Sequence, residues 1–230
     1  MKLKALFKYK SSQDTRDAFV ISELKNLKKN SHILDAGCGS QRYRNYCNHL
    51  IYRSQDFAAY NISIKKMFGQ NKQSRYKYGQ IDYLGDIWKI DEKDLKFNAI
   101  LCTEVLEHIP YPNRTIKEFS RLLKPNGFLI LTIPSNCLRH MDPYFFYTGF
   151  SDRWISKILS ENKLEVKKCI QVGDYYSWMS KELYRTIRSH SYLALFFLLP
   201  ALIWFFIKKE NQISRNSLCE GYHILAKKIK

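Results

Sequence analysis

Acidic side chains follow three successive apolar runs of the sequence, and two glycines follow the first of them. The run "ILDAGCGS" contains Asp35 and continues through Gly37 and Gly39. Asp56 ends the run "YRSQDF", and Asp86 lies in "DYLGDIW". Glycines at such a place let the backbone approach a ligand, and open α/β sheets bind their ligands at the carboxyl ends of their strands. Each acid alone is typical of a helix cap or a solvated loop, but three at successive strand ends predict one shared ligand site.

The glycine turn argues against a dinucleotide as that ligand. The dinucleotide fingerprint G-x-G-x-x-G has a third glycine, and Arg42 stands at that position here. A bulky side chain there resists the close approach of a pyrophosphate. A carboxylate such as Asp56 can accept hydrogen bonds from both hydroxyl groups of a ribose. The pattern therefore favours a ligand that contains a ribose but no pyrophosphate at this turn.

The elements that would position these residues alternate between short apolar runs and helical patterns. The segment 11–30 is expected to form an amphipathic helix, because Val20, Leu24 and Leu27 repeat at helical spacing. A further helix in "NRTIKEFSRLLKPNG" is expected to begin with Asn113 as its cap and to stop at Pro-Asn-Gly. The apolar runs are "HILDAG", "LIYRSQDF", "YGQIDYL", "FNAILCTEV" and "GFLILTIP". This alternation predicts a single α/β domain with a doubly wound, parallel sheet covered by helices on both faces.

The composition limits the partners of the protein. The 230 residues include 38 Lys and Arg against 21 Asp and Glu, a formal net charge of +17, which implies attraction to anionic groups such as nucleic acid, lipid headgroups or phosphate. The six cysteines have no metal-ligand spacing, which favours a reducing cytosol over a disulfide framework. The segment "MKLKALFKYK" lacks the apolar stretch of a secretory signal, so a cytoplasmic location is expected.

Taken in order, these motifs resemble those of class I S-adenosylmethionine-dependent methyltransferases of the small-molecule branch, including those found with bacterial surface-polysaccharide genes. "ILDAGCG", Asp56, Asp86, "FNAILCTEVLEHIP" and "LLKPNGFLILTIP" carry the resemblance over 31–134. It continues more loosely through "HMDPYFFYTGFSDRW" and ends with "GYHILAKK" as the last strand. The resemblance implies a mostly parallel seven-stranded sheet of the Rossmann-like methyltransferase fold, with an apolar insertion between the last two strands.

The resemblance also assigns nine residues to an S-adenosylmethionine site. The carboxylate of Asp56 would hold the ribose hydroxyls, and Phe57 would lie against the adenine. The other seven would surround the methionine portion (Asp35, Gly37 and Gly39), meet the adenine edge (Asp86 and Ile87) and close the site beyond the fourth strand (Thr103 and Glu104).

Two histidines are candidate bases for the reaction. In "EVLEHIP", Glu104, Glu107 and His108 resemble an acid–acid–histidine set that is linked to a divalent cation in quinone-biosynthesis relatives. The same string occurs in many relatives without that role, so we expect no metal and a place for His108 in the wall of the site. His140, in "LRHMDPYFF", follows the fifth strand and would face the acceptor, with a solvated loop position as the alternative.

The apolar run from Leu193 to Ile207 contains no charged residue and a single proline, Pro200. One membrane crossing is disfavoured, because it would separate the strand candidates "KLEVKKCIQV" and "GYHILAKK" that should share a sheet. A buried core helix is an alternative. We expect instead that Pro200 bends the run into two short segments that dip into one leaflet. Arg185, Arg188, Lys208 and Lys209 would then reach anionic headgroups, which predicts peripheral contact with the cytoplasmic membrane face through 191–209.

These expectations divide the single domain into functional segments. They are an N-terminal helix (11–30), a cofactor-binding core (31–134), an acceptor-side region (135–180), an apolar insertion (185–215) and a last strand (219–230). The expected reaction is O-methylation of a small-molecule, glycan or lipid-linked acceptor. An RNA methyltransferase is the rival that the positive charge supports, although "CTEV" replaces the Asn/Asp-Pro-Pro-aromatic string of enzymes that methylate base amino groups. A binding protein without turnover is a second rival, and the oligomeric state is left open.

Overall fold

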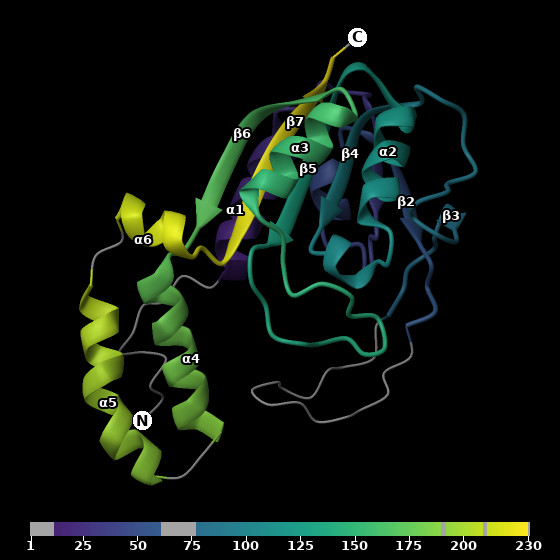
Figure 1. Ribbon diagram of the computed structural model, residues 1–230. Helices are drawn as coiled ribbons and strands as arrows, with labels where there is room; N and C mark the ends of the chain where they lie inside the picture. The colour runs from purple at the N-terminus through teal and green to yellow at the C-terminus, as the bar shows by residue number, and fades with distance from the viewer. Residues whose placement is uncertain (1–11, 61–76, 190–191, 209–210, 230) are drawn as a thin grey trace.

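The computed structural model of the chain describes residues 12–60, 77–189, 192–208 and 211–229. In these residues the chain forms one seven-stranded sheet in the order β3-β2-β1-β4-β5-β7-β6 (Figure 1). The strands are β1 (His32–Ala36), β2 (Ile51–Asp56), β3 (Tyr83–Leu84), β4 (Phe97–Thr103), β5 (Leu123–Pro134), β6 (Leu164–Val172) and β7 (Gly221–Lys228). The helices are α1 (Ser12–Lys25), η2 (Arg44–Cys47), η3 (Leu106–His108), α2 (Pro112–Leu122), α3 (Asp152–Glu161), α4 (Tyr175–Ser189), α5 (Tyr192–Ile207) and α6 (Gln212–Ser217). The parts of the sequence expectations that concern 1–11, 190–191, 209–210 and 230 lie outside the described residues.

The sheet is mostly parallel, as the sequence predicts. Strands β3, β2, β1, β4 and β5 run parallel to one another, and β7 is antiparallel to both β5 and β6. The residues of β1 and β4 are almost all buried, which explains why these segments read as continuous apolar runs rather than as alternating ones. Because the parallel strands end at the same edge, their carboxyl ends bring the predicted site residues together.

Alternate residues of the central strands form two separate cores. On one face, Ile33, Leu101 and Ile130 pack with Val20 and Leu24 of α1. On the other face, where Figure 1 shows α2 and α3, the apolar stripes of both helices meet the opposite side chains of the same strands. That second core includes Leu34, Ile100, Leu129, Ile116, Phe119, Leu122, Ile155 and Leu159. Because side chains alternate along a strand, successive residues contribute to the cores on opposite faces of the sheet.

Two expected helix boundaries are wrong. Asn113 does not cap α2: the capping position is Tyr111, which makes no side-chain cap, and Pro112 begins the helix. Proline suits that first position because its missing N–H would have no partner there in any case. The side chain of Asn113 instead accepts a hydrogen bond from the indole of Trp154 at 3.1 Å. The first helix also ends earlier than expected, at Lys25.

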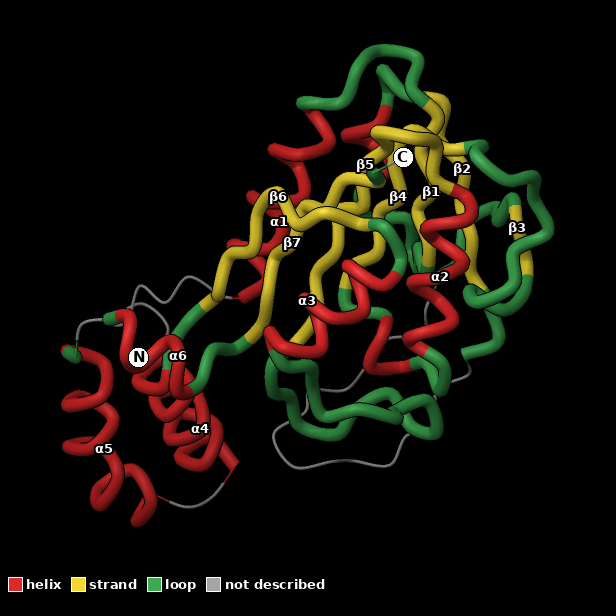
Figure 2. Tube along the Cα trace, turned by 45° about the horizontal axis from the view of Figure 1, so that its top comes forward, coloured by secondary structure: helices red, strands yellow, loops and turns green. Residues whose placement is uncertain are grey.

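Helices α4, α5 and α6 form an excursion between β6 and β7, here called the helical excursion (175–217). Figure 2 shows α4 and α5 standing away from the sheet as an antiparallel pair. The expected division of the run into two short segments at Pro200 is wrong, because α5 is one helix from Tyr192 to Ile207. The proline removes one backbone hydrogen bond without ending the helix, which packs against α4. The ring of Tyr176, for example, lies 6.4 Å from Trp204 and 6.3 Å from Phe205.

The outer side of α5 is exposed. Leu202 is buried, whereas Phe196 and Phe197 are 75% and 70% exposed. The alternative of a buried core helix is therefore wrong. Among the described residues, none of the helices combines the length and the apolar character needed to cross a membrane.

Candidate functional site

A cavity of about 1160 Å³ opens at the carboxyl ends of β1, β2 and β4. It is large enough for a nucleoside-sized small molecule. All nine residues predicted to bind a cofactor and both candidate bases line it. They are Asp35, Gly37, Gly39, Asp56, Phe57, Asp86, Ile87, Thr103, Glu104, His108 and His140.

The turn after β1 needs glycine for a steric reason. Gly37 has a φ of +71°, and a Cβ atom on it would lie 2.6 Å from both Cγ atoms of Val105. Its N–H donates to the backbone carbonyl of Gln55 at 2.9 Å, which ties the turn to β2. The turn therefore lies between β2 and the segment after β4, with no room for a side chain at Gly37.

The carboxylate of Asp56 is held in place by two backbone amides. Gly39 donates to its Oδ2 at 2.8 Å, and Ala58 donates to its Oδ1 at 2.9 Å. Each carboxylate oxygen can accept a further hydrogen bond. Asp56 is 6% exposed and lines the cavity, so the backbone presents a preorganised pair of acceptors to a ligand with two adjacent hydroxyl groups.

Asp35 is a buried carboxylate beside the same turn. Burial raises its pKa to about 7, even though the hydroxyl of Tyr52 donates to its Oδ2 at 2.7 Å and opposes the rise. A nearby cationic ligand would favour its ionised form. The site therefore suits a ligand that combines ribose hydroxyls with positive charge, which is the chemistry of S-adenosylmethionine. The sequence analysis did not identify Tyr52 as a partner of Asp35. Only its position on β2, which pairs with β1, could have indicated this contact.

Glu104 occupies an unusual backbone position. Its φ is +51°, in the left-handed region that costs a non-glycine residue about 1–3 kcal/mol. Its carboxylate lies 3.6 Å from the guanidinium of Arg16, which comes from α1. The strained turn lets Glu104 leave the end of β4 and face the cavity.

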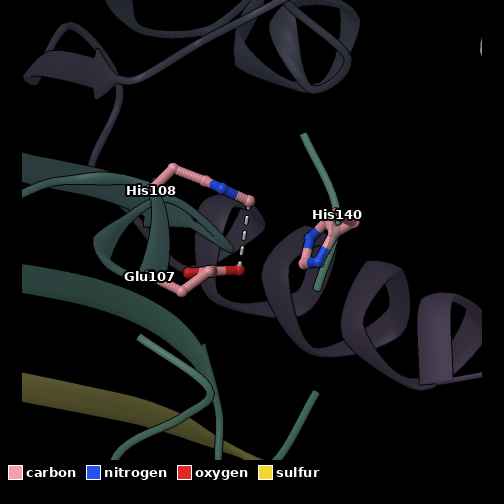
Figure 3. Close-up of side chains that lie close together, drawn as sticks. All are labelled: Glu107, His108 and His140. Atoms are coloured by element: carbon pink, nitrogen blue, oxygen red, sulfur yellow. Dashed lines mark ion pairs between the residues drawn. The ribbon is translucent and has the colours of Figure 1, made fainter. Parts of the chain in front are cut away.

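Glu107, His108 and His140 lie close together at one side of the cavity (Figure 3). The Nδ1–H of His108 donates to the backbone carbonyl of Tyr144 at 2.6 Å, and its Nε2 lies 3.7 Å from Glu107 Oε1. The Nδ1–H of His140 donates to the carbonyl of Leu138 at 2.8 Å. Both imidazoles therefore keep Nε2 as the nitrogen with a lone pair.

The two histidines differ in their environments. Burial, followed by the neighbouring His140, lowers the pKa of His108 to about 4, whereas His140 is partly exposed. Burial also raises the pKa of Glu107 well above its usual range, and Glu104 adds to that rise. His108 is thus a neutral, mostly buried side chain, which leaves His140 as the better candidate for a proton acceptor.

The same three side chains could hold a cation. Their ligand atoms all lie within 4.8 Å of one another, and Glu107 Oε2 is a buried oxygen without a hydrogen-bond partner. The set differs from the acid–acid–histidine string of the sequence, because His140 takes the place of Glu104. The geometry is compatible with a cation and equally with a proton-transfer site.

Tyr144 contacts both the part of the cavity near Phe57 and the part near His108, and the sequence analysis did not identify it. Its carbonyl holds His108, and its ring meets that of Phe57 edge-on with 4.9 Å between centroids. The aromatic string "YFFYT" was the available signal, but its spacing fits neither a strand nor a helix. The loop after β5 therefore contacts both the expected adenine side and the candidate bases.

Comparison with known proteins identifies the family of this architecture. A protein-family model described as a methyltransferase domain matches residues 13–180. Ubiquinone biosynthesis O-methyltransferase from Coxiella burnetii is 27% identical over 152 residues, which are 65% of this chain and 62% of that protein. The match thus covers less than two thirds of that curated relative.

Solved structures share the fold at low identity. A SAM-dependent methyltransferase from Methanosarcina mazei superposes with a TM-score of 0.53 at 15% identity, covering 91% of this chain and 97% of the other. Phosphoethanolamine N-methyltransferase 2 from Haemonchus contortus, solved in complex with S-adenosyl-L-methionine, gives 0.54 at 14% identity, with 94% and 53% covered. At these identities the likeness shows the fold alone.

Proposed function

Because this chain belongs to the methyltransferase domain family, we propose that it transfers a methyl group from S-adenosylmethionine to a hydroxyl group of a small-molecule, glycan or lipid-linked acceptor. One observation carries the proposal. The eleven residues that the sequence singled out come from separate strand ends and loops, yet they line one cavity.

The polar groups of the cavity support one placement of the cofactor. Asp56, already oriented by two amides, would accept hydrogen bonds from the ribose hydroxyls, and Asp35 with the turn at Gly37 would face the charged methionine portion. Phe57 and Ile87 would supply apolar surface for the adenine. The bound cofactor supplies the electrophilic methyl group, and the protein supplies orientation.

His140 is the proposed base. Its Nε2 is free to accept the proton of the acceptor hydroxyl as the oxygen takes the methyl group, since its Nδ1–H is engaged by Leu138. His108 would position this side chain: the two rings meet edge-on with 4.6 Å between centroids. His108 is the less suitable base at neutral pH, because burial lowers its pKa to about 4.

Helix α5 of the helical excursion is the proposed membrane contact. Among the side chains of α5 that the structure describes, seven large apolar ones are exposed: Leu193, Phe196, Phe197, Ile203, Trp204, Phe206 and Ile207. The ammonium of Lys208 lies 4.6 Å from the centre of the Trp204 ring, and Arg188 is exposed at the end of α4. An apolar face bordered by cations suits the surface of an anionic bilayer. The protein would bind one leaflet peripherally on the cytoplasmic side.

The test combines cofactor binding with methyl transfer. Calorimetry should detect S-adenosylmethionine binding to the full chain, and labelled methyl groups from the cofactor should enter the lipid fraction of a membrane extract. Labelling of RNA but not lipid would replace the proposed acceptor by nucleic acid. Cofactor binding without transfer to lipid, glycan or RNA fractions would favour a binding protein, and no binding would contradict the whole proposal.

A further inference from the structure

A second cavity, of about 290 Å³, adjoins the cofactor cavity, and we call it the acceptor chamber. Arg16, Glu104 and His140 line both cavities, so the proposed base stands at their boundary. The chamber lies at the ends of β5, β6 and β7. Its outer wall is α4, the helix that carries α5. The volume is close to the lower limit of ordinary small-molecule sites.

The wall of the acceptor chamber is polar but electrically balanced. Among the described residues it contains three basic side chains and three carboxylates. They face one another as ion pairs: Arg16 with Glu104 at 3.6 Å, Arg185 with Glu182 at 3.4 Å, and Lys181 with Glu220. All six side chains are no more than about one third exposed. Burial, with Arg16 nearby, lowers the pKa of His223 to about 4, so this lining residue adds no charge at neutral pH.

The equal numbers of cations and carboxylates in the wall favour some classes of ligand over others. A hydroxyl group both donates and accepts hydrogen bonds, and a wall of paired cations and carboxylates offers partners for both. An anionic head would meet as many carboxylates as cations, so the wall gives it little net attraction. A flat aromatic head would offer these half-buried polar groups few hydrogen bonds in return for the water that it displaces. The indole of Trp178 lines the same chamber and supplies one apolar face.

We propose that the acceptor chamber binds the uncharged, hydroxyl-rich sugar ring of a lipid-linked acceptor, with one hydroxyl directed to His140 and one ring face on Trp178. The proposal rests on the methyltransferase function above and names its acceptor class. Since α4 forms the wall of the chamber and packs against α5, a lipid tail would leave the chamber on the side of the membrane-binding helix. The positive charge of the chain then serves the membrane surface rather than the recognition of the acceptor.

The experiment compares three probes that share one tail: octyl β-D-glucoside, octyl phosphate and 4-octylcatechol, each below its micellar concentration. Saturation-transfer NMR with the full chain should show strong transfer to the glucoside ring protons. The Trp178→Ala variant should bind the glucoside about tenfold more weakly, and Trp178→Phe should restore most of the loss because it keeps an aromatic face. The Ile213→Ala variant changes an exposed residue of α6 outside the chamber and should match the wild type.

Titration of the same samples with S-adenosylmethionine separates the possible failures. Unchanged cofactor affinity in Trp178→Ala shows that the variant is folded and that any lost glucoside binding is local. If the wild type binds the cofactor but prefers octyl phosphate or 4-octylcatechol, or if Trp178→Ala binds the glucoside normally, the sugar chamber is wrong while the methyltransferase function stands. If the wild type does not bind the cofactor, the proposed function itself fails.

Discussion

Two regions of the molecule differ in which side chains they bury. One is the sheet edge formed by the carboxyl ends of β1, β2 and β4, and the other is the helical excursion between β6 and β7. At the sheet edge, the carboxylates of Asp35 and Asp56 are 3% and 6% exposed and are held by hydrogen bonds. On the excursion, the rings of Phe196 and Phe197 are 70% exposed or more. Buried acids are costly unless a ligand or partner compensates them, and exposed aromatics are costly unless a surface covers them.

This difference indicates that the two regions are suited to different ligands. Strands β1 and β4 are buried on both faces and β2 is buried over its last three residues, so the sheet edge is a packed frame that suits a cofactor of fixed structure. The excursion is joined to the sheet through β6 and β7 and carries the proposed contacts with the acceptor and the membrane surface. Substitutions in one region should therefore leave the function of the other intact, and the predictions below test that independence.

The largest effect is expected at Gly37. The Gly37→Ala variant should lose at least about a hundredfold in cofactor affinity by calorimetry, because the new Cβ overlaps Val105 and alanine resists a positive φ. Adding Val105→Ala should recover part of the loss by removing the overlapping methyl groups. Vesicle binding should stay normal in both variants. Wild-type affinity in Gly37→Ala would mean that the turn does not approach the ligand.

His140 should carry the next largest effect, on turnover alone. His140→Ala should reduce methyl transfer about 10²–10⁴-fold with unchanged cofactor affinity, because it removes the proton acceptor at the boundary of the two cavities. His108→Ala should lower turnover less. Equal turnover of both variants and the wild type would exclude both histidines as the base.

At Asp56 the expected loss is in cofactor binding. Asp56→Ala removes two charge-assisted hydrogen bonds to the ribose and should weaken binding by about 2–4 kcal/mol. Asp82 is the matched control, because it is an acid on the same side of the sheet that bonds Arg53 and Ser54 outside the cavity. Asp82→Ala should lower the free energy of unfolding but not the affinity. A similar loss of affinity in both variants would point to general disruption of the sheet edge.

A smaller effect is expected on the excursion. Phe197→Ser should weaken binding to vesicles of phosphatidylcholine and phosphatidylglycerol by about 1.5–3 kcal/mol, the value of one buried aromatic side chain. Ile213→Ser, which changes an equally exposed residue of α6, is the control. Replacement of 193–207 by a short Gly/Ser linker should remove vesicle binding altogether and leave cofactor binding intact. A wild-type chain that ignores these vesicles would contradict the membrane contact.

The mildest effect is a pH dependence set by Asp35. Its pKa is raised to about 7, so the carboxyl is mostly protonated below that pH and cannot attract the cationic part of the cofactor. Affinity should therefore rise with pH and be about tenfold weaker near pH 6 than near pH 8. Asp35→Asn should abolish the dependence. Tyr52→Phe should move its midpoint upward, because the lost hydrogen bond was lowering that pKa.

The sequence alone was sufficient to predict the fold and the residues along one wall of the site. Buried parallel strands read as apolar runs, and the acids and glycines that follow them must gather at one edge of the sheet because parallel strands end together. Asp35, Gly37 and Asp56 could therefore be predicted from local order along the chain. The expectations that failed, at Asn113 and Pro200, concerned local signals that tertiary packing overrode.

Only the tertiary structure decided which groups face one another across the site. His108 and His140 are 32 positions apart in sequence, and the loop that folds Tyr144 back onto His108 brings the two rings to 4.6 Å. The balanced wall of the acceptor chamber likewise combines α1, the residue after β4, α4 and the segment before β7, whose charges look unrelated along the chain. Such pairings depend on loop and helix placement, which has no period in the sequence, and burial then lowers the pKa of His108.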